Sequence, residues 1–124
     1  MTTTTYVPPG WPAAVRPPGA PDWEGTAVAF LLDCCPPDFR GYAVLRRHPI
    51  VLARFAVAAV GAQIEACRAG LGTCRAELGE YVPPDALEAA ACAWQQEEAA
   101  LLRTRREVAL VEAALRGRVF VRKL

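Results

Sequence analysis

One block of the sequence, residues 50–81, repeats its apolar residues at alternating spacings of three and four. The pattern runs without a slip through Ile50, Ala53, Val57, Val60, Ile64, Cys67, Leu71, Cys74, Leu78 and Tyr81. This spacing is typical of a helix that packs along its whole length against another helix, as in a coiled coil or a bundle. The block therefore predicts one long helix with a continuous packing face.

Prolines separate this block from its neighbours, because proline is rarely accommodated inside a helix. The proline-free blocks predict short helices at about 22–35 and 39–47, and long helices at about 50–81 and 85–117. Asp85 is the expected N-cap of the last helix. Its seam is formed by Leu87, Ala90, Trp94, Glu97, Leu101, Thr104, Val108, Val111 and Leu115. Two long helices of similar length, joined by a short turn, predict an antiparallel hairpin.

The predicted fold is all-α: a coiled-coil-like antiparallel hairpin, two short N-terminal helices and an extended Pro-rich arm. Six of the eleven prolines fall within residues 1–21, which form this arm, and residues 22–124 form a single helical domain ending in a basic tail, 118–124. A Pro-rich terminus is often mobile. This one carries Tyr6, Trp11 and Val15, whose burial is worth about 1.5–3 kcal/mol each, so a docked arm is the alternative.

Composition favours a cytoplasmic protein. The formal net charge is +1, so no global field indicates a nucleic acid or a membrane as partner. The N-terminus lacks the pattern of a secretory signal, and Arg54 interrupts the longest apolar run, so neither secretion nor a membrane span is expected. Five cysteines, an odd number, fit reduced thiols better than a disulfide framework.

The first long helix has a second apolar face, made mostly of alanine. Leu52, Phe55, Ala59, Ala62, Ala66 and Ala69 repeat on the side opposite the seam. A helix that is apolar on two sides needs a neighbour on each of them. The second neighbour is either the short N-terminal helices or a second copy of the chain, and these six residues are the predicted interaction face of a homodimer.

The cysteines are expected to be core residues rather than ligands. In the stretch CRAGLGTC, Cys67 and Cys74 lie on one helical stripe about 10 Å apart, too far for a disulfide. Their spacing does not suit zinc, and the chain has one histidine, so no metal site or cofactor is predicted. Cys92 and the adjacent Cys34 and Cys35 leave open a thiol- or metal-responsive sensor.

Catalysis is not expected. The chain contains no serine, and no Walker loop, nucleophile elbow or metalloprotease motif occurs. We expect no catalytic residue and predict a non-catalytic helical interaction or scaffolding module.

The C-terminal part is rich in arginine. Candidate anion-binding residues are Arg103, Arg105, Arg106, Arg116 and Arg118, within the basic segment 103–123. Basic residues late in a helix complement its dipole, which is the simplest explanation. The alternative is a nucleic-acid-associated regulator that uses this segment.

Overall fold

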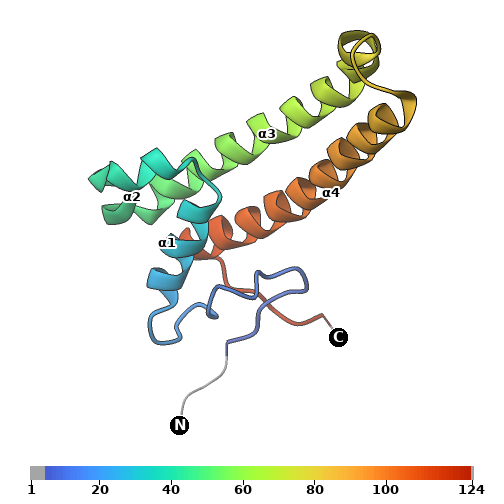
Figure 1. Ribbon diagram of the computed structural model, residues 1–124. Coiled ribbons are helices and arrows are strands. Elements are labelled where there is room, and N and C mark those ends of the chain that lie inside the picture. The colour runs from blue at the N-terminus through green and yellow to red at the C-terminus, as the bar shows by residue number, and fades with distance from the viewer. Residues whose placement is uncertain (1–4, 124) are drawn as a thin grey trace.

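The computed structural model describes residues 5–123 and is built from helices. They are α1 (Trp23–Asp33), the 3-10 helix η1 (Pro37–Gly41), α2 (Ala43–Arg47), α3 (Pro49–Leu78) and α4 (Pro84–Leu115). No β-strand occurs within residues 5–123, and the predicted all-α fold is confirmed. Figure 1 shows α3 and α4 side by side, with α1 and α2 at one end and the turn between the long helices at the other. We call these the wide end and the tip.

Several boundaries differ from those expected. The helix predicted at 39–47 is divided into η1 and α2, because Tyr42 between them has extended backbone angles. Helix α3 ends at Leu78, since residues 79 and 80 already form the turn. The prediction of Asp85 as N-cap is wrong. Helix α4 begins at Pro84, which suits a first helical position because it has no N–H to satisfy, and no side chain caps this end.

Two hydrophobic clusters hold the molecule together. The larger one lies at the wide end, where α1 and α2 contribute the fully buried Leu31 and Leu45, and α3 and α4 contribute Leu52 and Val108. The smaller cluster lies further along the α3–α4 pair and is made by Val60, Ile64, Cys67 and Leu101. The tip has less cover, and Leu78 and Tyr81 are exposed there.

The N-terminal arm is docked at the wide end. Pro12 and Val15 are buried, and the indole N–H of Trp11 donates a hydrogen bond of 2.8 Å to the carbonyl oxygen of Val15. The Trp11 ring also meets Phe120 of the C-terminal segment edge to face, with 5.9 Å between centroids. The arm and the tail therefore stabilise each other. The outermost parts predicted for them, residues 1–4 and Leu124, lie outside the described residues.

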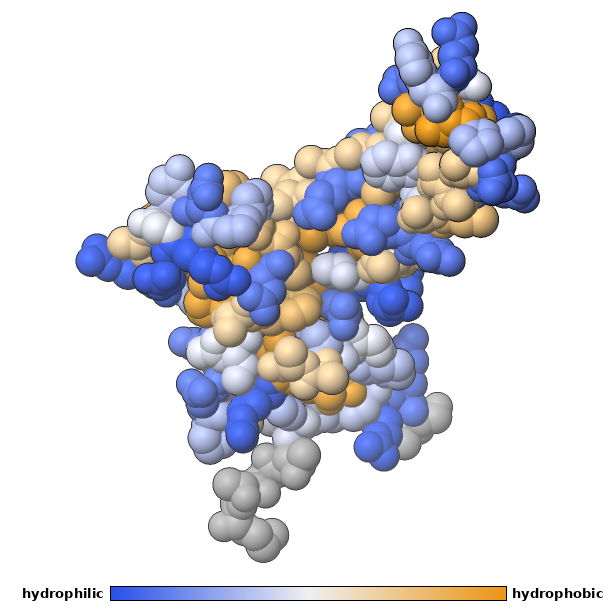
Figure 2. Space-filling view, in the orientation of Figure 1, coloured by the Kyte–Doolittle hydropathy of each residue, from blue (hydrophilic) through white to orange (hydrophobic). Residues whose placement is uncertain are grey.

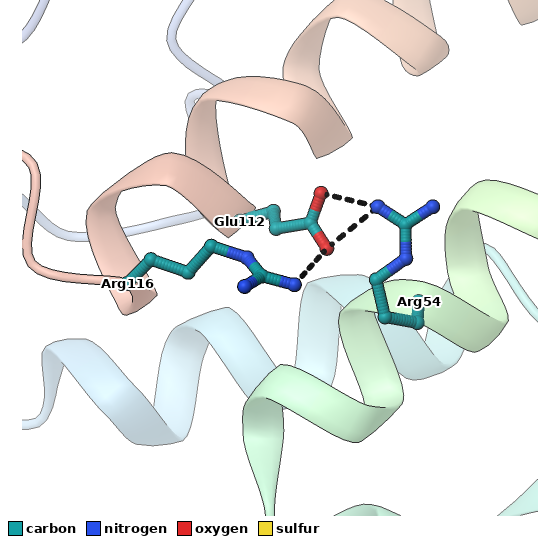
Figure 3. A network of polar contacts seen from close by, with 3 residues as sticks. All are labelled: Arg54, Glu112 and Arg116. Atoms are coloured by element: carbon teal, nitrogen blue, oxygen red, sulfur yellow. Dashed lines mark hydrogen bonds and ion pairs between the residues drawn. The ribbon is translucent and has the colours of Figure 1, made fainter.

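Ion pairs join the two long helices on the surface. Glu112 of α4 receives Arg54 of α3 at 2.9 Å and Arg116, the residue that follows α4, at 3.6 Å (Figure 3). Closer to the tip, Arg68 of α3 bonds Glu98 of α4 at 2.6 Å. These pairs link α3 to α4 beside the apolar seam, and surface ion pairs of this kind contribute up to about 1 kcal/mol each.

Helix α3 is long and apolar enough to cross a membrane, judged by length and composition alone. Its most apolar window has a mean hydropathy of 1.6, and 33% of that window is buried inside the structure. The core helix of a water-soluble protein passes the same test, so the pattern is weak evidence for a span. What it does show is that much apolar surface of α3 lies uncovered.

Candidate interaction groove and basic cluster

An apolar groove lies between α3 and the segment that follows α1. Its floor is the outer face of α3, formed by Phe55, Ala58, Ala59 and Ala62, and its wall is residues 34–39. The volume is about 910 Å³. Phe39 of the wall packs edge to face on Phe55, at 5.7 Å between centroids, and Phe55 is still 42% exposed. The groove is therefore an open apolar channel rather than an enclosed pocket.

Charges at the edge of the groove are already paired. Asp33 is bound by Arg40 at 2.6 Å, and Arg54 is bound by Glu112. The amide of Gln63 is turned back to donate to the carbonyl oxygen of Ala59, at 3.4 Å. A groove with paired charges and an alanine floor suits an apolar helix, because small side chains let a second backbone approach closely.

The predicted interaction face is divided by the structure. Leu52 is fully buried under the short helices, in the larger hydrophobic cluster. Phe55, Ala59 and Ala62 form the floor of the groove. Ala66 and Ala69 continue along the same side of α3 toward the tip and are exposed. Figure 2 shows weakly hydrophobic surface running along α3 from the wide end to the tip. The short helices therefore cover one end of this face and leave the rest open.

The wall of the groove carries two adjacent thiols, which are free. Burial, together with the neighbouring Cys35, Asp33 and Glu107, raises the pKa of Cys34 from 9.0 to about 11. Burial also raises the pKa of Cys35, against the opposing effect of Arg40. Both are protonated at neutral pH, and a thiol is a poor nucleophile compared with a thiolate. Within residues 5–123, no three His, Cys, Asp or Glu side chains are grouped to hold a metal ion.

The stretch CRAGLGTC lies inside α3, between the groove and the tip. Cys67 and Cys74 are buried toward α4 and Leu71 is half-buried, while Gly72 is exposed. Burial raises the pKa of Cys67. Gly70 lies under the indole of Trp94, and this close approach is the structural role of that glycine. The stretch is thus part of the packing between the two long helices.

The arginines predicted to bind anions do not form one site. Arg103 and Arg106 line a hollow of about 480 Å³ with Pro9 and Gly10 of the arm. Arg105 is exposed, and because it follows Arg103 by two positions it lies about 200° further around the helix. Arg116 is engaged by Glu112.

Arg118 belongs to a second basic cluster, at the termini. Its guanidinium lies over the ring of Phe120 at 5.3 Å, and Arg122 lies over Tyr6 at the same distance. Together with Lys123 they surround a hollow of about 580 Å³. Within residues 5–123, neither Arg118 nor Arg122 forms an ion pair with a carboxylate.

Two parts of these sites were not predicted from the sequence. The groove wall at residues 34–39 was not predicted: the Pro36-Pro37 pair was expected to separate two helices, and Cys34 and Cys35 were considered only as thiols. Tyr6 was noted as an apolar residue of the arm, and its pairing with Arg122 depends on how the two termini meet.

Comparisons with protein-family models, with curated proteins and with solved structures find no match to this chain.

Proposed function

We propose that this protein is a non-catalytic helical interaction module that associates with a second copy of itself. In this proposal α3 and α4 form a coiled-coil-like antiparallel hairpin, which serves as the scaffold, and the chain acts in the cytoplasm as a scaffolding or regulatory protein. The observation that carries the proposal is the open apolar groove, which continues into the exposed alanines of α3.

The energetics favour covering this surface. Burying apolar surface gains about 25 cal/mol per Å², and large uncovered apolar patches are uncommon on monomeric proteins. The small alanine side chains of the groove floor let a second helix approach α3 closely beside Phe55. The charged side chains at the groove edge are already paired, Asp33 with Arg40 and Arg54 with Glu112. Association therefore buries no unpaired carboxylate or guanidinium at this edge.

The test is the oligomeric state, measured by size-exclusion chromatography with light scattering across micromolar concentrations. The wild-type protein is expected to be dimeric, and Ala62→Glu, which places a charge on the groove floor, is expected to be monomeric. Ala93→Glu is the matched control, because Ala93 is an exposed alanine on α4. A monomeric wild-type protein contradicts the proposal. Recovery of the pure protein with lipid vesicles would instead assign the apolar face of α3 to a membrane.

A second candidate function, a nucleic-acid-associated regulator, is favoured by the cluster at the termini. Arg118, Arg122 and Lys123 supply positive charge, and Tyr6 and Phe120 supply aromatic rings. Cations interleaved with aromatic rings are the combination that single-stranded nucleic acids bind, through phosphate contacts and base stacking.

Fluorescence anisotropy with a labelled single-stranded oligonucleotide tests this candidate. Binding is expected at low salt, with log K falling linearly as log salt concentration rises. Arg118→Ala with Arg122→Ala is expected to flatten that slope, whereas Arg75→Ala, at an exposed position near the tip, is expected to leave it unchanged. Absence of binding at low salt excludes the candidate.

A further inference from the structure

We infer that two copies of the chain pack their α3 helices antiparallel, about a two-fold axis at Ala62, so that each groove receives the tip half of the partner's α3. This inference rests on the self-association proposed above and adds its geometry. The occupant of the groove, whose floor spans residues 55–62, is then residues 62–69 of a second copy.

The coverage of α3 is the first argument. The wall at residues 34–39 stands beside Phe55, Ala58 and Ala62 but does not extend to Ala66 or Ala69, which are exposed. Figure 1 shows the tip of the α3–α4 pair projecting away from α1 and α2. A two-fold axis at Ala62 exchanges the walled half of the face with the open half. Residues 34–39 of each copy then lie beside the exposed half of the partner's α3.

Side-chain size is the second argument. Phe55 and Ala69 lie seven residues before and after Ala62, which is about two turns or 10 Å in each direction. An antiparallel arrangement therefore sets the large, 42% exposed Phe55 of one copy against the small Ala69 of the other, and Ala62 against itself. A parallel arrangement sets Phe55 against Phe55 and separates the helices where the alanines would otherwise meet.

The distribution of charge is the third argument, and it specifies a second copy as the partner. Arg46, Arg47 and His48 are exposed beside the start of α3, and Glu77 and Glu80 are exposed at its end. Glu77 lies fifteen residues after Ala62, about 60° from the direction of Ala62. His48 immediately precedes α3, fourteen residues before Ala62. The two-fold axis brings the basic end of each copy to the acidic end of the other.

Contacts within one chain do not explain why the carboxylates of Glu77 and Glu80 stand at the end of α3. Glutamates at the C-terminal end of a helix are disfavoured by its dipole, and within residues 5–123 neither Glu77 nor Glu80 forms an ion pair. Arg75 points about 140° away from the direction of Ala62, so it does not offset them on this face. Glu65, the other acidic residue beside the face, is bound by Arg68 at 3.3 Å.

Disulfide trapping tests the register, because only a residue on the axis faces its own copy in an antiparallel pair. The background replaces Cys34 and Cys92 with alanine, which removes the two cysteines that are not buried. In this background Ala62→Cys is expected to form a covalent dimer at least about tenfold faster than Ala69→Cys, whose two copies lie about 20 Å apart along the axis. A mixture of the Phe55→Cys and Ala69→Cys proteins is expected to give the mixed dimer, identified by mass spectrometry.

The outcomes separate the register from the association itself. Covalent dimers of Ala69→Cys alone, formed as fast as those of Ala62→Cys, overturn the antiparallel arrangement in favour of a parallel one. Dimers in light scattering that are trapped by none of these cysteines overturn the inference and leave self-association standing. A monomer in light scattering overturns both.

Reversal of charge gives an independent test on the otherwise native chain. Glu77→Arg with Glu80→Arg is expected to raise the dissociation constant of the dimer about tenfold, and adding Arg46→Glu with Arg47→Glu is expected to restore it. Equal dissociation constants for the native and Glu77→Arg, Glu80→Arg proteins contradict the end-to-end charge pairing.

Discussion

The indole of Trp94 in α4 lies directly over Gly70 in α3. A Cβ atom at position 70 would come within 2.5 Å of two of the ring carbons, closer than such atoms approach each other in proteins. The absence of a side chain at Gly70 therefore lets Trp94 close the α3–α4 interface between the smaller cluster and the tip.

Replacement of Gly70 by alanine is expected to destabilise the protein by about 1–3 kcal/mol, because Trp94 must move out of its packed position. Gly72 is the matched control. It is exposed, and a Cβ atom added there would meet no neighbouring atom within 4 Å, so Gly72→Ala is expected to gain about 0.5–1 kcal/mol from helix propensity. Urea unfolding measures both. Equal stabilisation by the two alanines would show that Trp94 does not restrict position 70.

Trp11 is expected to hold both terminal segments in place. Trp11→Ala removes the hydrogen bond to Val15 and the edge-to-face contact with Phe120. Amide hydrogen exchange is then expected to accelerate in the arm and in residues 118–123, while residues 64–78 of α3, which lie beyond the larger cluster that Trp11 contacts, are unaffected. Trp11→Phe retains an aromatic ring but not the N–H, so its exchange rates are expected to lie between those of the native protein and of Trp11→Ala. Unchanged exchange in residues 118–123 would contradict the coupling of the two termini.

The helices were predictable because their signals are local. Proline placement and the alternating three-and-four spacing depend on residues near one another in sequence, and they identified the middle of the packing face of α3, including Cys67 and Cys74. The ends of the predicted seam were wrong, since Ile50, Leu78 and Tyr81 are exposed. Which part of the second face stays open was not predictable, since it depends on how far residues 34–39 reach across α3. Leu52 and Ala62 belong to the same three-and-four repeat in the sequence, yet the short helices bury Leu52 and leave Ala62 exposed.

Glu112 is expected to contribute more to stability than an exposed carboxylate, because it receives both Arg54 and Arg116 while its side chain is only 13% exposed. Glu112→Gln is expected to cost about 1 kcal/mol at low ionic strength, and less at high salt, where screening weakens the pairs. Glu88→Gln, at an exposed position on the same helix, is the control and is expected to change stability little. A cost for Glu112→Gln that is the same at high salt would exclude an ionic origin.

The cysteines are expected to react with a maleimide in an order set by exposure. Cys92 is exposed and is labelled first, whereas Cys35, Cys67 and Cys74 are buried and require unfolding. Cys34 is intermediate in exposure and is labelled slowly at neutral pH, because its pKa is raised. Mass spectrometry of digested, labelled protein gives the order. Rapid labelling of Cys34 at neutral pH would support the thiol-sensor hypothesis instead.

Stability is expected to fall at alkaline pH through the groove thiols. The pKa of Cys34 is raised from 9.0 to about 11, so between these values the unfolded chain loses its proton while the folded chain keeps it. The folded state then binds more protons, and the free energy of unfolding decreases as pH rises above about 9. Cys34→Ser, whose hydroxyl does not ionise in this range, is expected to reduce the decrease, which urea unfolding at pH 8 to 10.5 measures. The same slope in both proteins would show that Cys34 is not the group responsible.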